Sequence, residues 1–271
     1  MNAHADYEQN GFYVAKGLFS VAETEAIRDH YTQMVETSDR FADGGVDRDS
    51  DDPLRRYPRL MQMHLGDDVA MQFLLDSRLE AVFMEILGAS PFAVQTMLYF
   101  KPAGARGQAL HQDNRYLRVE PGTCTAAWMA LDRCDPENGC LQVVPGSHVL
   151  PVLCPTKADT TVSFTQETVP IPEASEVVNV VMDPGDVLFF HGNLIHGSGP
   201  NLSKDRFRRI IVGHYVVAEA QKVGYWYAPA FRFDGTVVQL KPAEGGTPCG
   251  TFTPAGTVEM SDLVEEVLAR H

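Results

Sequence analysis

The sequence predicts a mostly β protein with flanking α-helices, built on a double-stranded β-helix core of the jelly-roll or cupin-like kind. Beyond Pro91 the chain contains several short segments rich in β-branched and aromatic residues, each bounded by Gly, Pro, Asn or Asp. No helical pattern separates these segments, which favours an antiparallel sandwich or barrel over a doubly wound parallel sheet. The segments that we expect to be strands are residues 93–100, 124–132, 140–144, 177–182, 186–190 and 208–217.

Helices are expected before this β core. We interpret residues 7–19 as a short strand with a turn, followed by a helix that begins at Ser20. Glu23, three positions later, completes a capping box, in which each side chain bonds the other residue's backbone N–H. A second helical region, residues 68–87, should end at Gly88, because glycine is the residue type that helix C-termini prefer.

No internal repeat and no clear linker divides the chain, so a single domain is expected. A short closing helix is expected at about residues 261–270. Within residues 1–271 the sequence predicts a helical N-terminal part (about 1–90), the jelly-roll core (about 91–220) and a C-terminal extension (221–271).

The composition, 44% hydrophobic and 21% charged, is that of a globular protein. The net charge of −14 repels phosphate backbones and anionic membrane surfaces, so nucleic acid and membranes are not expected as partners. No apolar run approaches the ~18–20 residues that span a bilayer, and no basic flank followed by an apolar core indicates a signal peptide. A small-molecule substrate and a cytoplasmic location are therefore expected.

The cysteines are odd in number and include no CxxC pair. In a chain of this size without an export signal, reduced thiols are the expectation, and a cysteine-based zinc site is disfavoured. The five cysteines are Cys124, Cys134, Cys140, Cys154 and Cys249.

An acidic stretch and a basic one lie side by side in the first third of the chain. Residues 38–53 are acidic and contain glycine, which predicts a mobile surface loop. The basic segment Arg55–Arg59 follows, and charge balancing with the preceding aspartates is the favoured interpretation. A lid over the functional site is a further hypothesis for the two segments together.

A His-x-Asp pair, His111 and Asp113, lies in a stretch (residues 107–116) that we expect to be extended. Side chains at positions i and i+2 of a strand share one face, about 6.8 Å apart, so both ligating atoms can converge on one ion while Gln112 points away. One imidazole and one carboxylate supply two ligands of the 2-His-1-carboxylate triad, which binds non-haem Fe(II) and leaves coordination positions open.

The second histidine of such a triad must come from a distant segment. His196 follows a predicted strand and a short loop. Its rival is His191, whose alternative role is to pack or to orient a ligand. His148 is expected in a loop, and His214 lies inside a predicted strand, where ordinary core packing is expected.

Two arginines, Arg208 and Arg209, open the last predicted strand of the core. A guanidinium binds a carboxylate bidentately, so either arginine would anchor a buried cosubstrate that carries one. Alternation puts the two on opposite faces of the strand, but both faces are apolar and the periodicity does not choose between them. The alternative for either is a surface ion pair, for example with Asp205.

Four motifs, taken in order, resemble the phytanoyl-CoA dioxygenase family, which consists of Fe(II)- and 2-oxoglutarate-dependent oxygenases on a jelly-roll core. The motifs are HQDNRYLRV, AAWMALDRCDPENGCLQVVPGSH, PGDVLFFHGNLIHGSGPN and FRRIIVGHY. The resemblance covers about residues 93–217, with weaker similarity in GFYVAKGLFS near the N-terminus. It implies that His111, Asp113 and His196 are the iron ligands.

The resemblance also implies a cosubstrate site. Ser198 and Arg208 would hold the distal carboxylate of 2-oxoglutarate, while Trp128 and Met97 would line its pocket. The gap from His196 to Arg208 is one residue longer than is usual in the family, which leaves Arg209 open as the anchor. Residues expected to face the substrate near the metal are Gln95, Tyr99, Tyr116 and Trp226.

The implied activity is hydroxylation of an unactivated C–H bond in a small organic substrate, with O₂ consumed and 2-oxoglutarate converted to succinate and CO₂. Halogenating relatives have a small residue where this chain has Asp113, so halogenation is disfavoured. The net charge of −14 disfavours an acyl-CoA substrate. The alternatives are a cupin-like metal-dependent isomerase or hydrolase, and a non-catalytic binding module on the same fold.

Overall fold

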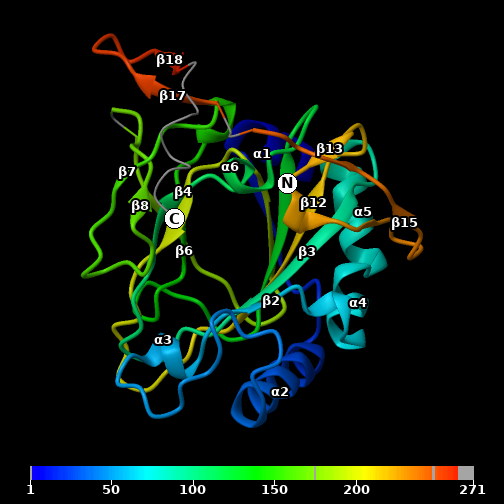
Figure 1. The fold of residues 1–271 in the computed structure, drawn as a ribbon, viewed down its shortest axis with the longest axis vertical. Coiled ribbons are helices and arrows are strands. Elements are labelled where there is room, and N and C mark those ends of the chain that lie inside the picture. The colour runs from blue at the N-terminus through cyan, green and yellow to red at the C-terminus, as the bar shows by residue number, and fades with distance from the viewer. Residues whose placement is uncertain (1, 174, 246–247, 262–271) are drawn as a thin grey trace.

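The computed structural model describes residues 2–173, 175–245 and 248–261, and its centre is a pair of antiparallel sheets packed against each other (Figure 1). The larger sheet runs in the order β1 (Phe12–Ala15), β10 (Val187–His191), β5 (Cys124–Ala130), β12 (Ile210–Val216), β3 (Phe92–Tyr99), β14 (Ala230–Phe231) and β15 (Val237–Val238), and β2 (Leu60–Met61) also pairs with β3. The smaller sheet runs β4 (Gln108–His111), β11 (His196–Ser198), β6 (Leu141–Val143) and β9 (Val178–Val180).

Short strand pairs extend this core. They are β7 (Thr156–Lys157) with β8 (Glu167–Thr168), β13 (Lys222–Val223) with β16 (Lys241–Pro242), and β17 (Cys249–Phe252) with β18 (Val258–Ser261). The predicted mostly β, jelly-roll class is confirmed, and each of the six segments expected to be strands contains one. The strands β4 and β11, which carry the candidate metal ligands, are short and were not delimited by the sequence pattern.

The helices α1 to α5 precede the core, as expected, and helices among them cover one face of the larger sheet, whereas the short α6 lies between β4 and β5 (Figure 1). The capping box of Ser20 and Glu23 is present at the start of the second helix, and Gly88 ends the fifth with φ of 73°. The helices are α1 (Ala3–Asn10), α2 (Val21–Thr37), α3 (Pro53–Arg56), α4 (Asp68–Leu74), α5 (Ser77–Leu87) and α6 (Asn114–Leu117), with 3-10 turns η1 (Met63–Leu65), η2 (Ser147–Val149) and η3 (Tyr225–Tyr227).

The prediction for the N-terminal segment was partly wrong. Residues 7–10, expected to begin a strand, belong to α1, which Asn2 caps by accepting a hydrogen bond from the Ala5 N–H. Gly11, with φ of 80°, ends this helix, and β1 begins at Phe12. Because β1 pairs with β10, the helical N-terminal part supplies a strand to the core. The predicted closing helix lies outside the described residues apart from Ser261, which ends β18.

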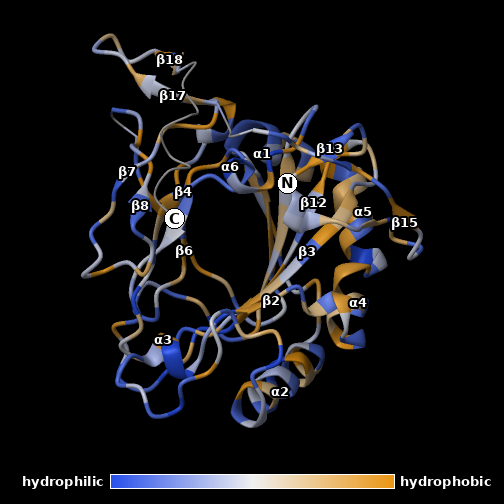
Figure 2. Cartoon of the chain, viewed as in Figure 1, coloured by the Kyte–Doolittle hydropathy of each residue, from blue (hydrophilic) through white to orange (hydrophobic). Residues whose placement is uncertain are grey.

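The strands of the larger sheet are apolar on both faces because each face is covered. Ala127 and Met129 of β5 pack with the helices, whereas Ala126 and Trp128 of the same strand pack with Leu141 and its neighbours from the smaller sheet. In Figure 2, hydrophobic residues are seen along strands of the larger sheet and on the helices α4 and α5 beside it. This alternation decides which side chains face the space between the sheets.

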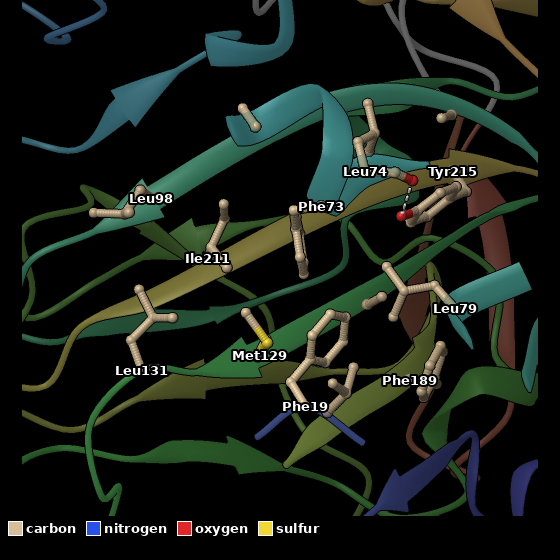
Figure 3. Close-up of a cluster of buried hydrophobic side chains, with 14 of the residues drawn as sticks. Phe19, Phe73, Leu74, Leu79, Leu98, Met129, Leu131, Phe189, Ile211 and Tyr215 are labelled. Atoms are coloured by element: carbon tan, nitrogen blue, oxygen red, sulfur yellow. Dashed lines mark hydrogen bonds between the residues drawn. The ribbon is translucent and has the colours of Figure 1, made fainter. Parts of the chain in front are cut away.

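The helix-covered face is the main hydrophobic core, drawn in part in Figure 3. Phe83 of α5 contacts Phe189 edge to face, with ring centroids 5.0 Å apart, and also packs on Tyr215. The Tyr215 hydroxyl donates to the Leu74 carbonyl at 2.8 Å, as the dashed line in Figure 3 marks, so its one polar atom is satisfied within the core. The helices are thereby held on the sheet, and the opposite face remains available for a site.

The expectation of reduced thiols was wrong for two cysteines. Cys154 and Cys249 form a disulfide that joins β17 to the chain between β6 and β7. The backbone supports the same pairing, since the Cys154 N–H donates to the Gly250 carbonyl and the Gly250 N–H to the Val152 carbonyl. Cys124, Cys134 and Cys140 are free and buried. The two cysteines are 95 positions apart in the sequence and belong to no CxxC motif, so no local pattern predicts that they pair.

Candidate metal centre and adjoining cavity

Three buried side chains, His111, Asp113 and His196, gather at one point beside the smaller sheet. One ligating atom from each lies within 4.8 Å of the others. Oδ1 of Asp113 is 3.5 Å from Nε2 of His111 and 3.6 Å from Nε2 of His196. Among the described residues this is the group of histidine and carboxylate side chains that could hold a metal ion, and it has the composition of a 2-His-1-carboxylate triad.

Strand pairing brings the two histidines together. His111 ends β4 and His196 begins β11, and the two residues are direct partners in the antiparallel register. Their ring centroids are 4.2 Å apart. Gly197 and Gly107 allow this close approach, because a Cβ on either would lie within 2.7 Å of backbone atoms of the other strand.

The expected geometry of the His-x-Asp pair was wrong, although the two side chains do converge. The strand stops at His111, and Asp113 has helical backbone angles, φ −64° and ψ −34°, at the start of α6. The turn of the chain, not strand alternation, therefore brings the carboxylate beside the imidazole. Gln112 points away as expected: its amide donates to the carbonyls of Pro151 and Asn193, and its oxygen accepts from the Leu153 N–H.

Hydrogen bonds orient both imidazoles for metal binding. Nδ1 of His111 donates to the Ala109 carbonyl and Nδ1 of His196 donates to the Leu194 carbonyl, each at 2.9 Å. These bonds place the proton on Nδ1 and leave the Nε2 lone pair directed at Asp113. The Gln108 amide donates to Nε2 of His111 at 3.1 Å, so a metal ion would displace that side chain.

The electrostatics keep the group ready to bind a cation. Burial, together with the neighbouring His111, lowers the pKa of His196 to about 4, so this imidazole is neutral at physiological pH. Burial by itself raises the pKa of Asp113, but the imidazoles of His196, His111 and His214 more than offset it and hold that pKa well below the ordinary value. A neutral imidazole beside an ionised carboxylate is the donor set that a divalent metal requires.

A cavity of about 290 Å³ adjoins the three ligands. Each residue that the family resemblance assigned to the cosubstrate lines it: Ser198, Arg208, Trp128 and Met97. Arg208 lies on the inward side of its strand, 3% exposed, with its guanidinium 5.6 Å from the Trp128 ring. Arg209 faces the helices instead, where it forms a bidentate ion pair with Asp132 and contacts Thr32 of α2.

The buried guanidinium of Arg208 forms no ion pair with any side chain in the described part of the chain. Its Nε donates to the Gly139 carbonyl at 3.2 Å, while the carboxylate of Asp132 is taken up by Arg209. A buried cation without an acidic partner is costly, so the arrangement favours an anionic ligand in the cavity.

Three of the four residues expected to meet the substrate also line the cavity, namely Gln95, Tyr99 and Tyr116. Trp226 was predicted wrongly: it is 79% exposed and lies outside the lining, whereas the next residue, Tyr227, contributes to it. Both residues belong to the 3-10 turn η3.

The rival histidines occupy other positions. Nδ1 of His191 accepts from the Asn193 N–H, and the ring lies edge to face with His148, outside the cavity lining. His214, expected to be ordinary core, lines the cavity, and its Nε2 donates to Oδ2 of Asp113 at 3.2 Å.

Sequence reasoning also missed Lys101, a lysine only 3% exposed that contacts Ser198. A charged residue directly after a buried strand is the signal that could have identified it.

Ion pairs hold the acidic loop of residues 38–53 to its basic neighbour. Asp43 pairs with Arg59, and Asp47 pairs with Arg55. The charge balance expected from the sequence is thus present as contacts. Arg59 in turn lines the cavity, so the loop contacts the wall of the site.

The fold and the site together define a class. Two antiparallel sheets with a 2-His-1-carboxylate group between them, beside a cavity with an unpaired buried arginine, fit a non-haem iron centre with an anionic cosubstrate. The donor set is oxygen and nitrogen only, and the three ligands lie close enough to share one ion.

Comparison with known proteins gives the family. The sequence model of the family phytanoyl-CoA dioxygenase (PhyH) matches residues 7–210, and the chain belongs to this family. Phytanoyl-CoA dioxygenase 1 of Oryza sativa subsp. japonica is 26% identical over 230 residues, covering 73% of this chain and 82% of the relative. The human peroxisomal phytanoyl-CoA dioxygenase is 26% identical over 231 residues, covering 80% of this chain and 68% of the relative.

A solved structure shares the fold. The non-heme alpha ketoglutarate dependent epimerase SnoN from nogalamycin biosynthesis superposes with a TM-score of 0.64 at 23% identity, over 81% of this chain and 83% of its own. Because it belongs to the phytanoyl-CoA dioxygenase family, the protein is an Fe(II)- and 2-oxoglutarate-dependent enzyme that uses O₂. The group of His111, Asp113 and His196 could hold the metal ion that such an enzyme needs. None of the described helices is long and apolar enough to cross a membrane.

Proposed function

We propose that this enzyme hydroxylates an unactivated C–H bond of a small organic substrate. The observation that carries the proposal is the complete set of His111, Asp113 and His196 in the lining of a cavity that is also lined by Arg208, which has no ion pair among the described side chains. A retained carboxylate at position 113 leaves no vacant ligand position for a halide. Three protein ligands on one ion leave positions for a 2-oxo acid and for O₂.

The residues have separate tasks in this proposal. His111 and His196 present the Nε2 lone pairs to iron, and Asp113 presents one carboxylate oxygen. Arg208 and Ser198 hold the distal carboxylate of 2-oxoglutarate. Trp128 and Met97 exclude water beside it. When bound, iron and 2-oxoglutarate supply the oxidising chemistry, in which O₂ yields succinate, CO₂ and the hydroxylated substrate.

The substrate faces the remaining wall of the cavity in this proposal. Gln95 and Tyr99 supply polar groups there, and Tyr116, which is 46% exposed, lies at its outer edge. Burial raises the pKa of Tyr99, which keeps its hydroxyl protonated and able to donate. A neutral or cationic molecule suits the net charge of −14 better than an acyl-CoA, although the curated relatives carry the phytanoyl-CoA name. A cytoplasmic location belongs to the same proposal.

Spectroscopic titration tests the metal and cosubstrate site. Fe(II) and 2-oxoglutarate are added anaerobically, and a visible metal-to-ligand charge-transfer band is expected in the wild type and not in His111→Ala. Absence of the band in the wild type, or its persistence in the variant, contradicts the proposed ligand set. If the band forms but O₂ causes no decarboxylation, a cupin-like isomerase, a hydrolase or a silent binding module gains support.

Product mass then tests the reaction type. Compounds are screened by succinate formation, and the product of any hit is expected to carry one oxygen atom from ¹⁸O₂. The fold alone does not select hydroxylation, because SnoN is an epimerase. A product of unchanged mass supports epimerisation, and a product two hydrogens lighter supports ring closure.

A further inference from the structure

Lys101 is a second buried cation beside the cavity, as little exposed as Arg208. It follows β3, is 3% exposed, and does not belong to the lining. No ion pair to it is present within residues 2–173, 175–245 and 248–261. Its Nζ instead meets three oxygen acceptors: Ser198 Oγ at 2.7 Å, the Gly199 carbonyl at 2.6 Å and the Gly139 carbonyl at 3.2 Å.

Three acceptors match the three N–H donors of an ammonium group. All of the lysine's hydrogen bonds are therefore used within the protein, and none remains for a ligand. Burial and the neighbouring Arg208 guanidinium lower the pKa of Lys101 well below its ordinary value. A bound anion nearby would offset both effects.

Lys101 lies close to Arg208. Both cations donate to the same acceptor, the Gly139 carbonyl, each at 3.2 Å. Gly139 has φ of 74°, and a Cβ on it would lie 2.5 Å from the Gly199 carbonyl oxygen and 3.0 Å from Cδ of Lys101. Two cationic side chains at one carbonyl, neither in an ion pair with any described side chain, are costly unless the cavity holds an anion.

The contacts of Ser198 show how Lys101 acts on the cavity. Ser198 Oγ accepts from Nζ of Lys101 and, at 3.3 Å, from the backbone N–H of Gln108. A hydroxyl oxygen has two lone pairs, and both are then occupied. The hydroxyl hydrogen must point away from both donors, and Ser198 itself lines the cavity.

We infer that Lys101 is a positioning residue for the cosubstrate: by filling a lone pair of Ser198, it turns the Ser198 hydroxyl hydrogen toward the distal carboxylate of 2-oxoglutarate. This inference rests on the proposed function, which places that carboxylate at Arg208 and Ser198. Lys101 lies outside the cavity lining, so in this inference its charge acts on 2-oxoglutarate without direct contact. A lysine with a purely structural role would only satisfy the Gly139 and Gly199 carbonyls, and its loss would affect ligands with and without a distal carboxylate equally.

Calorimetry on the Mn(II)-loaded protein under anaerobic conditions tests the inference without turnover. Titration with 2-oxoglutarate is compared with 2-oxopentanoate, which has the 2-oxo acid but no distal carboxylate. Lys101→Met is expected to weaken 2-oxoglutarate binding about 10- to 100-fold, the scale of a hydrogen bond to a charged group, and to leave 2-oxopentanoate binding unchanged. Equal weakening for both ligands indicates a structural role and overturns the inference.

A double-mutant cycle isolates the path through Ser198. If Lys101 acts through the hydroxyl, Lys101→Met must cost less in a Ser198→Ala background than in the wild type, whereas additive losses overturn this path. Mn(II) affinity and the melting temperature check that each variant is folded. Lys101→Gln, uncharged but with an N–H donor, replaces the methionine variant if that one does not fold, and its expected loss is smaller but equally selective.

The outcome is separable from failure of the proposed function. If the wild type does not bind 2-oxoglutarate more tightly than 2-oxopentanoate, the proposed cosubstrate site is wrong. If the wild type and the Met and Gln variants of Lys101 all prefer 2-oxoglutarate to 2-oxopentanoate to the same degree, the proposed cosubstrate site is supported and the role of Lys101 is wrong.

Discussion

Nε2 of His214 lies 3.2 Å from Oδ2 of Asp113, whereas Oδ1 of the same carboxylate faces His111 and His196. The two oxygens of Asp113 thus have different partners, one toward the candidate metal position and one toward a buried imidazole. Nδ1 of His214 has no hydrogen-bond partner within the described part of the chain, and the ring bonds Asp113 through its Nε2–H. That N–H fixes the rotation of the carboxylate.

We expect His214→Leu to weaken metal binding about 10- to 100-fold, since loss of a group that orients a ligand has effects of this size. His214→Gln keeps an N–H donor and should lose less. Mn(II) affinity measured by electron paramagnetic resonance checks both. His64→Leu is the matched control, because His64 is equally buried but bonds Thr96 and lies outside the cavity lining. If the leucine variants at 214 and 64 bind Mn(II) alike, the carboxylate does not depend on His214.

The neighbouring arginines should separate function from stability. Arg208→Met is expected to raise the dissociation constant of 2-oxoglutarate more than about 10-fold, because its guanidinium is buried in the cavity lining without an ion pair among the described side chains. Arg59 also lines the cavity, but it is paired with Asp43. Arg209→Met should leave that constant unchanged and lower the free energy of unfolding by about 1–3 kcal/mol, because Asp132 loses its bidentate partner. Calorimetry and urea denaturation measure the two quantities, and the reverse pattern would exchange the roles of the two residues.

The choice between these arginines shows what the sequence could and could not predict. Alternation correctly groups Arg208 with Ile210 and Val212, and Arg209 with Ile211. Which group faces the space between the sheets depends on where the helices pack, and both groups are apolar because the helices cover one face and the smaller sheet covers the other. The family resemblance supplied the choice that periodicity lacked.

Other parts of the site depend on contacts between distant segments. Lys101 meets Ser198 across 97 positions, and His214 meets Asp113 across 101. Neither contact leaves a local pattern in the sequence. Residue type and motif order were enough to select His111, Asp113 and His196 as candidate ligands, and the structure brings these three together, even though the strand geometry assumed for Asp113 was wrong. The disulfide was not predictable, since an odd number of cysteines without a spacing motif gives no pairing.

Breaking the disulfide should destabilise the fold. Cys154→Ser is expected to lower the free energy of unfolding by up to about 4–5 kcal/mol, the value that the chain-entropy model gives for a loop of this length. Urea denaturation without reductant measures the loss, and reduction of the wild type should reproduce it. Cys134→Ser, at a buried free cysteine, controls for replacing a thiol. Alkylation of the unfolded, unreduced protein should label three thiols, and labelling of all five would contradict the pairing.

Stability should fall in acid partly because of His64. Burial lowers the pKa of His64 to about 4, and no described residue forms a hydrogen bond with its Nε2 to compensate. The unfolded chain therefore binds a proton on this ring at a higher pH, near 6.5, than the folded protein does. Between pH 4 and pH 6.5 the unfolded state holds more protons than the folded state. The stability that the neutral His64 ring contributes is therefore complete above about pH 6.5 and is lost as the pH falls toward 4.

The expected loss from this one group is about 3 kcal/mol across that window, at 1.36 kcal/mol per pKa unit. His196 and His191, whose pKa values burial also lowers to about 4, add similar slopes, so the wild-type profile alone does not identify His64. The difference between wild type and His64→Leu does. Leucine does not titrate, so the variant's disadvantage at pH 7.5 should shrink or reverse by pH 4.5. Urea denaturation at the two values measures this, and parallel profiles would show that His64 is not the buried, neutral ring described.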